Sequence, residues 1–218
     1  MVTQKIEVPN KLSEITLGQY QKFSKIFNKD TDQDFLQKKM VEIFCGIPLA
    51  DVNKIKYSSV KKVVETISKM FNEKPKLQKI FDFGGKEFGF HPQLSEMTFG
   101  EFVDADTFTG DWDTMDKAMS VLYRPVKDKF KGSYLIEDYD GETKEFMKQM
   151  PLDVAFGAIF FLSNLRNELM RLILSYSAKE TKKLTPQQVR VLEKNGDGIA
   201  QCIASLERTS QSLTRLKN

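Results

Sequence analysis

Apolar residues along this chain of 218 residues recur mostly every three or four positions, which is the spacing of amphipathic helices. Thr16 and Gln19 match a capping box, so a helix is predicted to begin there with Leu17 and Tyr20 on its apolar face. Further helices are predicted over 32–44, from Ser58 or Ser59 to Met70, over 111–124 and over 144–150. The dominant pattern is helical.

Between positions 80 and 90 the apolar residues alternate with polar ones instead, which is the period of a β-strand. Gly84 and Gly85 divide this stretch, and two glycines supply the positive φ angles that a tight hairpin needs. We therefore predict a β-hairpin near 79–90. A second short strand is predicted over 134–139, after a polar loop over 127–132.

A nine-residue pattern occurs twice, from Leu12 to Tyr20 and from Leu94 to Phe102, with five identical positions. Each copy follows a strand-like segment and a proline, and each contains a Thr-x-x-Gln/Glu capping box. Two interpretations remain open: one effective strand-to-helix transition used twice, or a duplicated unit whose flanks have diverged. In both, the residues of the pattern are structural.

The most apolar stretch runs from Val154 to Leu165, and Arg166 interrupts it. It is shorter than the roughly 20 residues of a membrane span, so we predict a long central apolar helix of the core. The fold class predicted is mainly α: a helical core domain over 1–180 with a small β-hairpin and short strands, followed by a C-terminal amphipathic helix in an extension over 185–218. The apolar residues of that extension suit packing on their own domain or on another chain.

Charge and compartment signals exclude several classes. Lys and Arg number 33 against 30 Asp and Glu, and a net charge of +3 argues against a dedicated nucleic-acid or membrane-surface binder. The N-terminal residues lack the apolar segment of a secretory signal, so a cytoplasmic site of synthesis is expected. Cys45 and Cys202 are expected to be free thiols in apolar surroundings rather than a disulfide.

Candidate chemistry is sparse. An acidic cluster between Glu101 and Asp116 departs from the calcium-loop pattern, and helix capping by Asp111 or Asp113 is the simpler interpretation. His91 is the sole histidine and has no neighbouring nucleophile motif. A basic run from Arg124 to Lys131 is diluted by Asp128, and a solvated loop is expected there. We therefore assign no catalytic, metal-binding or cofactor-binding residues, and expect no enzyme activity.

Phenylalanine is abundant, with 17 copies against one tryptophan. Most fit buried helix faces, but a two-stranded hairpin has two faces and seldom stands alone. One face must pack on the helices, and the other is a candidate contact surface. The interface candidates from the hairpin and from the C-terminal extension are Phe81, Phe83, Phe88, Phe90, Ile199, Cys202, Leu206, Leu213 and Leu216.

Several segments in order, L-S-E-I-T-L-G-Q-Y, E-I-F-C-G-I-P, L-Y-R-P-V, Y-L-I-E-D-Y-D-G and M-P-L-D-V-A-F-G-A-I-F-F-L, resemble small virion proteins of crAss-like and related Bacteroidales tailed bacteriophages. The resemblance covers roughly residues 12–175 and includes no catalytic motif. It implies a structural component or an assembly factor encoded near portal, neck and tail genes.

The leading hypothesis is a non-enzymatic virion protein that assembles as a homo-oligomeric ring in the neck, portal or tail region, after synthesis in the host bacterial cytoplasm. A ring needs two complementary patches on one chain. Its partners would be other virion proteins such as portal or tail components, with no membrane, nucleic acid or cofactor. The alternatives are a tail assembly chaperone that is absent from the particle, and a metal-dependent enzyme that uses the acidic cluster.

Overall fold

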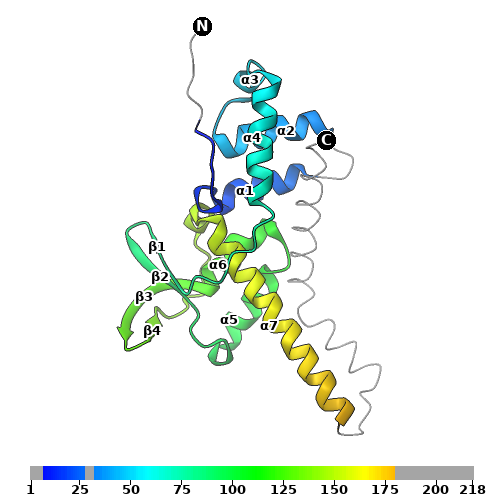
Figure 1. Cartoon of the computed structure of the whole chain (residues 1–218). Coiled ribbons are helices and arrows are strands. Elements are labelled where there is room, and N and C mark those ends of the chain that lie inside the picture. The colour runs from blue at the N-terminus through cyan, green and yellow to red at the C-terminus, as the bar shows by residue number, and fades with distance from the viewer. Residues whose placement is uncertain (1–6, 28–31, 180–218) are drawn as a thin grey trace.

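The computed structural model describes residues 7–27 and 32–179. Their helices and strands, in chain order, are η1 (Leu12–Glu14), α1 (Leu17–Ile26), α2 (Gln33–Cys45), α3 (Leu49–Val52), α4 (Tyr57–Met70), β1 (Ile80–Phe83), β2 (Lys86–Phe90), η2 (Leu94–Glu96), α5 (Phe99–Phe108), η3 (Trp112–Thr114), α6 (Met115–Leu122), β3 (Tyr123–Phe130), β4 (Ser133–Ile136), η4 (Glu145–Gln149) and α7 (Leu152–Lys179), where η marks a 3-10 helix. Helices α1 to α4 gather at one end of the molecule, and the sheet lies to one side of the start of α7 (Figure 1).

The prediction of a mainly α fold is wrong, because the hairpin is half of a four-stranded antiparallel sheet in the order β1-β2-β3-β4. The fold is a mixture of helices and sheet. The segment from Tyr123 to Phe130, predicted as the end of a helix and a loop, is strand β3. Its residue Tyr123 pairs with Phe90 of β2, and its residue Phe130 pairs with Ser133 of β4. Its many charged residues give no strand pattern in the sequence. The strand forms because its backbone pairs with neighbouring strands, and β2 lies far away in the sequence.

The prediction of a long apolar helix at the centre of the core is also wrong. Helix α7 has 28 residues, but its complete burial ends at Ile159. Further along, Leu169 and Leu172 are 51% and 63% exposed. Only the first turns of α7 are buried in the core, because the helix then runs away from the sheet and the core (Figure 1).

The core is built around aromatic rings from distant segments. Tyr20 of α1, Trp112 of η3 and Phe156 of α7 are all buried, and their ring centroids lie 4.8–5.4 Å apart in edge-to-face contacts. Such contacts between aromatic rings add to the free energy of burial. At Gly157, next to Phe156, a Cβ atom would lie 2.5 Å from a backbone carbonyl oxygen of the loop before β1, so this close approach requires glycine.

The nine-residue pattern forms the same local structure twice, a 3-10 helix followed by a capped α-helix. In the first copy the backbone N–H of Thr16 donates to Gln19 Oε1 at 2.8 Å, and in the second copy Thr98 N–H donates to Glu101 Oε2 at 2.6 Å. Both capping boxes are confirmed. The hairpin is confirmed as well, with φ angles of +59° and +77° at Gly84 and Gly85.

The predicted C-terminal extension over 185–218, with its amphipathic helix, lies outside the described residues. Among the interface candidates this applies to Ile199, Cys202, Leu206, Leu213 and Leu216.

Candidate functional site

Helix α5 presents three large apolar residues of its first half to solvent. Phe99 is 84% exposed, Phe102 is 59% exposed and Val103 is 39% exposed. In the first copy of the repeat the positions equivalent to Phe99 and Phe102 are Leu17 and Tyr20, and both are completely buried. The two copies therefore share their backbone structure and differ in what covers it.

The residue of α5 that is buried is Glu101, whose side chain is 5% exposed. Its Oε1 lies 2.5 Å from Nη1 of Arg124 on β3, and 3.8 Å from Nε2 of His91 at the end of β2. A buried charge requires a partner, and this ion pair supplies one for both groups. It also joins α5 to the sheet, which orients the helix with Phe99 and Phe102 outward.

The protonation of this cluster follows from its surroundings. Burial alone raises the pKa of Glu101, but hydrogen bonds from Thr98 and the neighbouring Arg124 more than offset this, so the pKa is lowered. Burial lowers the pKa of His91; Glu101 partly opposes that change, whereas Arg124 adds to it. At neutral pH the cluster therefore holds a carboxylate, a guanidinium and a neutral imidazole.

An aromatic pocket of about 530 Å³ lies beside this cluster, between the sheet, the segment after β4 and η4. Its apolar wall includes Phe83, Phe88 and Phe146, whose ring centroids lie 5.7–5.9 Å apart. Arg124 and Tyr139 also line the pocket, with the guanidinium 5.8 Å from the centre of the tyrosine ring. The volume suits one or two apolar side chains of a peptide segment.

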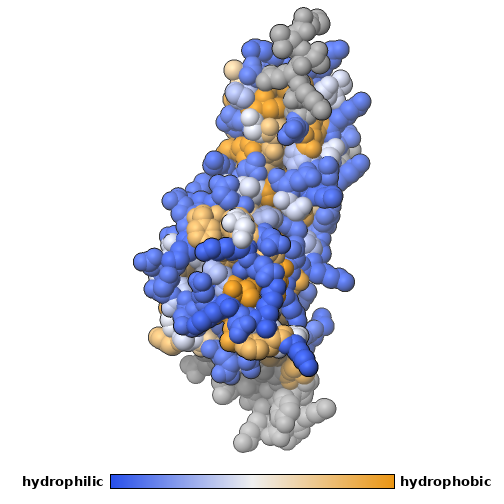
Figure 2. Space-filling model, turned by 90° about the vertical axis from the view of Figure 1, so that its left-hand side faces the viewer, coloured by the Kyte–Doolittle hydropathy of each residue, from blue (hydrophilic) through white to orange (hydrophobic). Residues whose placement is uncertain are grey.

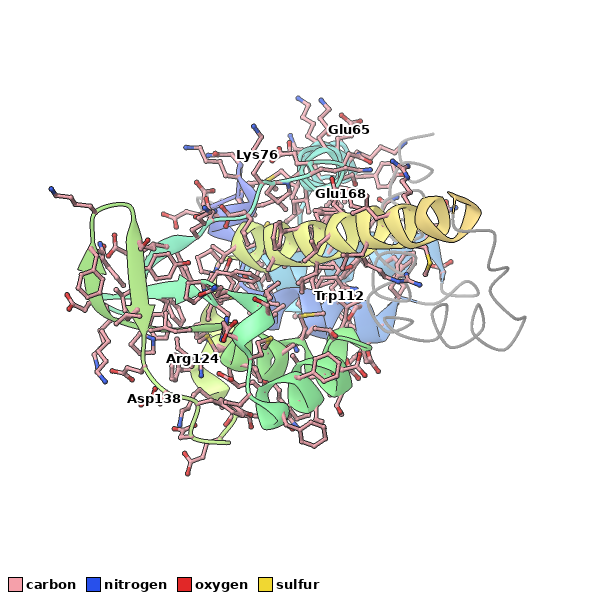
Figure 3. All side chains as sticks on the ribbon, turned by 90° about the horizontal axis from the view of Figure 1, so that it is seen from below. Glu65, Lys76, Trp112, Arg124, Asp138 and Glu168 are labelled. Atoms are coloured by element: carbon pink, nitrogen blue, oxygen red, sulfur yellow. The ribbon has the colours of Figure 1, made fainter. Side chains whose placement is uncertain are left out.

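The rim of the aromatic pocket is rich in carboxylates, which come from Glu137, Asp138, Asp140 and Glu142. Lys144 lies 2.6 Å from Asp140 and 3.0 Å from Glu142, so these two are paired. Glu137 and Asp138 are exposed, and neither forms an ion pair with any residue that the structure describes. Arg124 and Asp138 lie on the opposite side of the molecule from Glu65 and Glu168 (Figure 3).

Helix α5 and the aromatic pocket are linked, because the hydroxyl of Tyr139 donates a hydrogen bond of 2.6 Å to Asp104 of α5. On the side of the molecule that carries the sheet, apolar side chains surface in separate patches between hydrophilic ones (Figure 2). The arrangement can hold an apolar segment of another protein.

The hairpin candidates are placed mostly in the core. Phe81, Phe88 and Phe90 are 8%, 4% and 3% exposed, so Phe81 and Phe90 belong to the core, and Phe88 is a largely buried part of the wall of the aromatic pocket. The sheet explains this, because β3 covers the edge of β2 and brings Tyr123 against both Phe81 and Phe90. Phe83 is partly exposed and faces the aromatic pocket, where it can still contact a partner.

The sequence patterns did not single out Phe99, Phe102, Glu101 or Arg124 as a functional group. By sequence alone, Glu101 belongs to the acidic cluster and Arg124 to a basic run. One sequence signal points to Glu101, because it occupies the position of Gln19 in the first copy of the repeat. The second copy therefore carries a charged residue where the first copy has a neutral, partly buried one.

The remaining acidic residues of the cluster serve the fold. Asp111 caps η3 through a hydrogen bond from the N–H of Asp113, and Asp113 lies 3.5 Å from Lys25. Asp116 accepts a hydrogen bond of 2.8 Å from Gln21. Over residues 7–27 and 32–179, no group of three or more His, Cys, Asp or Glu side chains is placed to hold a metal ion.

The thiol of Cys45 is free, and burial raises its pKa to about 11, so it stays protonated at neutral pH.

None of the helices described here has the length and apolarity to span a bilayer. Comparison of the chain with protein-family models, curated proteins and solved structures gave no match.

Proposed function

We propose that this chain is a non-enzymatic structural protein of a tailed phage, and that it assembles as a ring in the neck, portal or tail region of the virion. The segments that resemble small virion proteins of crAss-like phages support this proposal. The observation that carries it is the outward apolar face of α5, where Phe99 and Phe102 stand exposed while Glu101 is buried.

The contrast between the two repeat copies supports a binding role for the outward face of α5. Burying a phenylalanine side chain contributes about 1.5–3 kcal/mol, and α5 forgoes this twice where α1 does not. Exposed residues of this size at the centre of an interface are common sites of strong binding between proteins. The outward face of α5 therefore suits one of the two patches that a ring requires.

The test has two parts. Mass spectrometry of purified phage particles should find this chain at a stoichiometric level, and native mass spectrometry of the purified chain should find a closed oligomer. The double variant F99S/F102S should lose the oligomer. The control variant F130S should keep it, because Phe130 is 56% exposed at the end of β3, beside the turn to β4 and outside α5. Particles that lack the chain would refute the structural role.

A second candidate is a tail assembly chaperone that holds another virion protein and leaves before the particle is complete. The aromatic pocket favours it, because a pocket of this volume suits side chains of an extended segment. This candidate requires that the chain is absent from purified particles, and that phage lacking its gene accumulate heads without tails.

A further inference from the structure

We propose that the aromatic pocket is the receptor for the segment Leu213–Lys217 of a neighbouring copy of this chain. The proposal rests on the ring function proposed above and adds a contact between neighbouring copies beside that of α5, with the pocket and the segment as its two complementary patches. It explains why an apolar pocket with a carboxylate rim stands open beside the sheet.

The chemistry of the segment matches that of the pocket. Its sequence is Leu-Thr-Arg-Leu-Lys, so two leucines alternate with two cations, Arg215 and Lys217. Leucine side chains fit a wall formed by Phe83, Phe88 and Phe146. The pairing is therefore apolar at its centre and ionic at its edge, as in most protein interfaces.

The charges at the rim favour a cationic segment. Lys86 and Lys144 also line the aromatic pocket, but Lys144 is held by Asp140 and Glu142, and Arg124 is neutralised by Glu101. What remains is the pair Glu137 and Asp138, adjacent in sequence and both exposed, with Lys86 on the hairpin side. Two carboxylates that form no ion pair within the described part of the chain, and that lie beside an apolar pocket, are complementary to Arg215 and Lys217.

The ring function proposed above selects a neighbouring copy as the partner, and the length of the chain permits this contact. The residues Met147 and Gln149 of η4 line the pocket just before α7 begins. Helix α7 then carries the chain about 42 Å, and it runs away from the sheet (Figure 1). The roughly 34 residues from Lys179 to Leu213 are long enough to span tens of ångströms to a second molecule. Repeated head to tail, such a contact closes a ring.

The test uses the full chain and two matched double variants. L213S/L216S removes the apolar contacts of the segment, and E137K/D138K reverses the charge of these two rim residues. Each should weaken self-association at least about 100-fold in analytical ultracentrifugation. The control E65K/E168K reverses two glutamates on the other side of the molecule, and it should assemble like the wild type (Figure 3).

Two mixing experiments make the test specific. A mixture of L213S/L216S with E137K/D138K should form one-to-one complexes, because one partner keeps its pocket and the other keeps its segment. The fourfold variant E137K/D138K/R215E/K217E exchanges the charges and should recover assembly to within about tenfold of the wild type.

Carbodiimide coupling of a mixture of isotope-labelled and unlabelled wild-type chain should join Lys217 of one copy to Glu137 or Asp138 of another. Coupling only within single chains, or a wild-type chain that remains a monomer, would overturn the proposal. So would full assembly of either double variant, and in that case the ring function itself would stand. The particle composition described above tests the ring function separately.

Discussion

Replacement of Glu101 by glutamine isolates the energetic role of the buried ion pair. Glutamine is the natural residue at the equivalent position of the first repeat copy, where its side chain accepts the capping hydrogen bond from Thr16 N–H. Glu101→Gln therefore keeps the capping box of α5 and removes only the charge. Arg124, whose side chain is 9% exposed, is then left as a buried cation without its partner.

The expected cost is about 3–5 kcal/mol of unfolding free energy, the usual range for removing one partner of a buried pair. For a domain of this size that corresponds to a fall in melting temperature of roughly 6–20 °C. The pair itself need not stabilise, because its desolvation opposes its Coulomb attraction. The double variant E101Q/R124M should therefore recover to within about 1–2 kcal/mol of the wild type.

The assay is urea denaturation followed by circular dichroism, with Glu96→Gln as the control, since Glu96 is an exposed glutamate of the same repeat copy. The pKa of Glu101 is lowered in the folded state, so its stabilisation is present above the unfolded pKa of about 4.3 and is lost as the pH falls through the folded pKa. The difference between wild type and E101Q should hold from pH 6 to 8 and shrink below about pH 4. A loss under 1 kcal/mol at pH 7, or additive effects of E101Q and R124M, would show that the pair is not coupled in this way.

Three further predictions concern the rest of the fold. The pKa of His91 is lowered in the folded state, so the stability that its neutral form contributes is complete above the unfolded pKa of about 6.5 and is lost as the pH falls through the folded pKa. In denaturation series, the wild type should therefore lose more unfolding free energy between pH 7.5 and pH 5 than His91→Asn. Gly157→Ala should cost about 1–3 kcal/mol because its Cβ would lie 2.5 Å from a backbone oxygen. Gly100→Ala in α5 should be neutral or stabilising by up to about 1 kcal/mol, because its Cβ would meet no packed neighbour within 4 Å beyond its own helix backbone and adjacent residues; equal melting temperatures of the two variants would contradict this. Leu17→Ala should cost about 2–5 kcal/mol and Phe99→Ala, at the equivalent position, less than about 0.5 kcal/mol in the isolated chain, and similar losses would mean that α5 is covered.

Local features of this protein could be predicted from the sequence because their hydrogen bonds close within a few residues. Asp32 caps α2 by accepting from the N–H of Phe35 at 2.8 Å, and Gly46 ends the helix with a φ of +66°. The cap of α4 is the exception: neither predicted serine caps it, and Lys56 stands at the N-cap. Even there, the existence of the helix followed from its apolar spacing.

The candidate site could not be predicted in the same way. The apolar residues of α5 have the spacing of a core-facing helix, and nothing within the segment says which side the sheet will occupy. That side is set by contact between Glu101 and Arg124, which are far apart in the sequence and meet only when β3 pairs with β2. The aromatic pocket likewise needs walls from the hairpin, β3 and η4 at once.

The sequence by itself thus determined the capped helices, the glycine turn of the hairpin and the twofold occurrence of one local structure, because each depends on backbone geometry over four to nine residues. Only the tertiary structure decided that the hairpin extends into a four-stranded sheet, and that the second repeat copy turns its phenylalanines outward. The physical reason is that burial is a property of neighbours. Leu17 and Phe99 have the same local structure, and the segments packed around them make one a core residue and leave the other exposed.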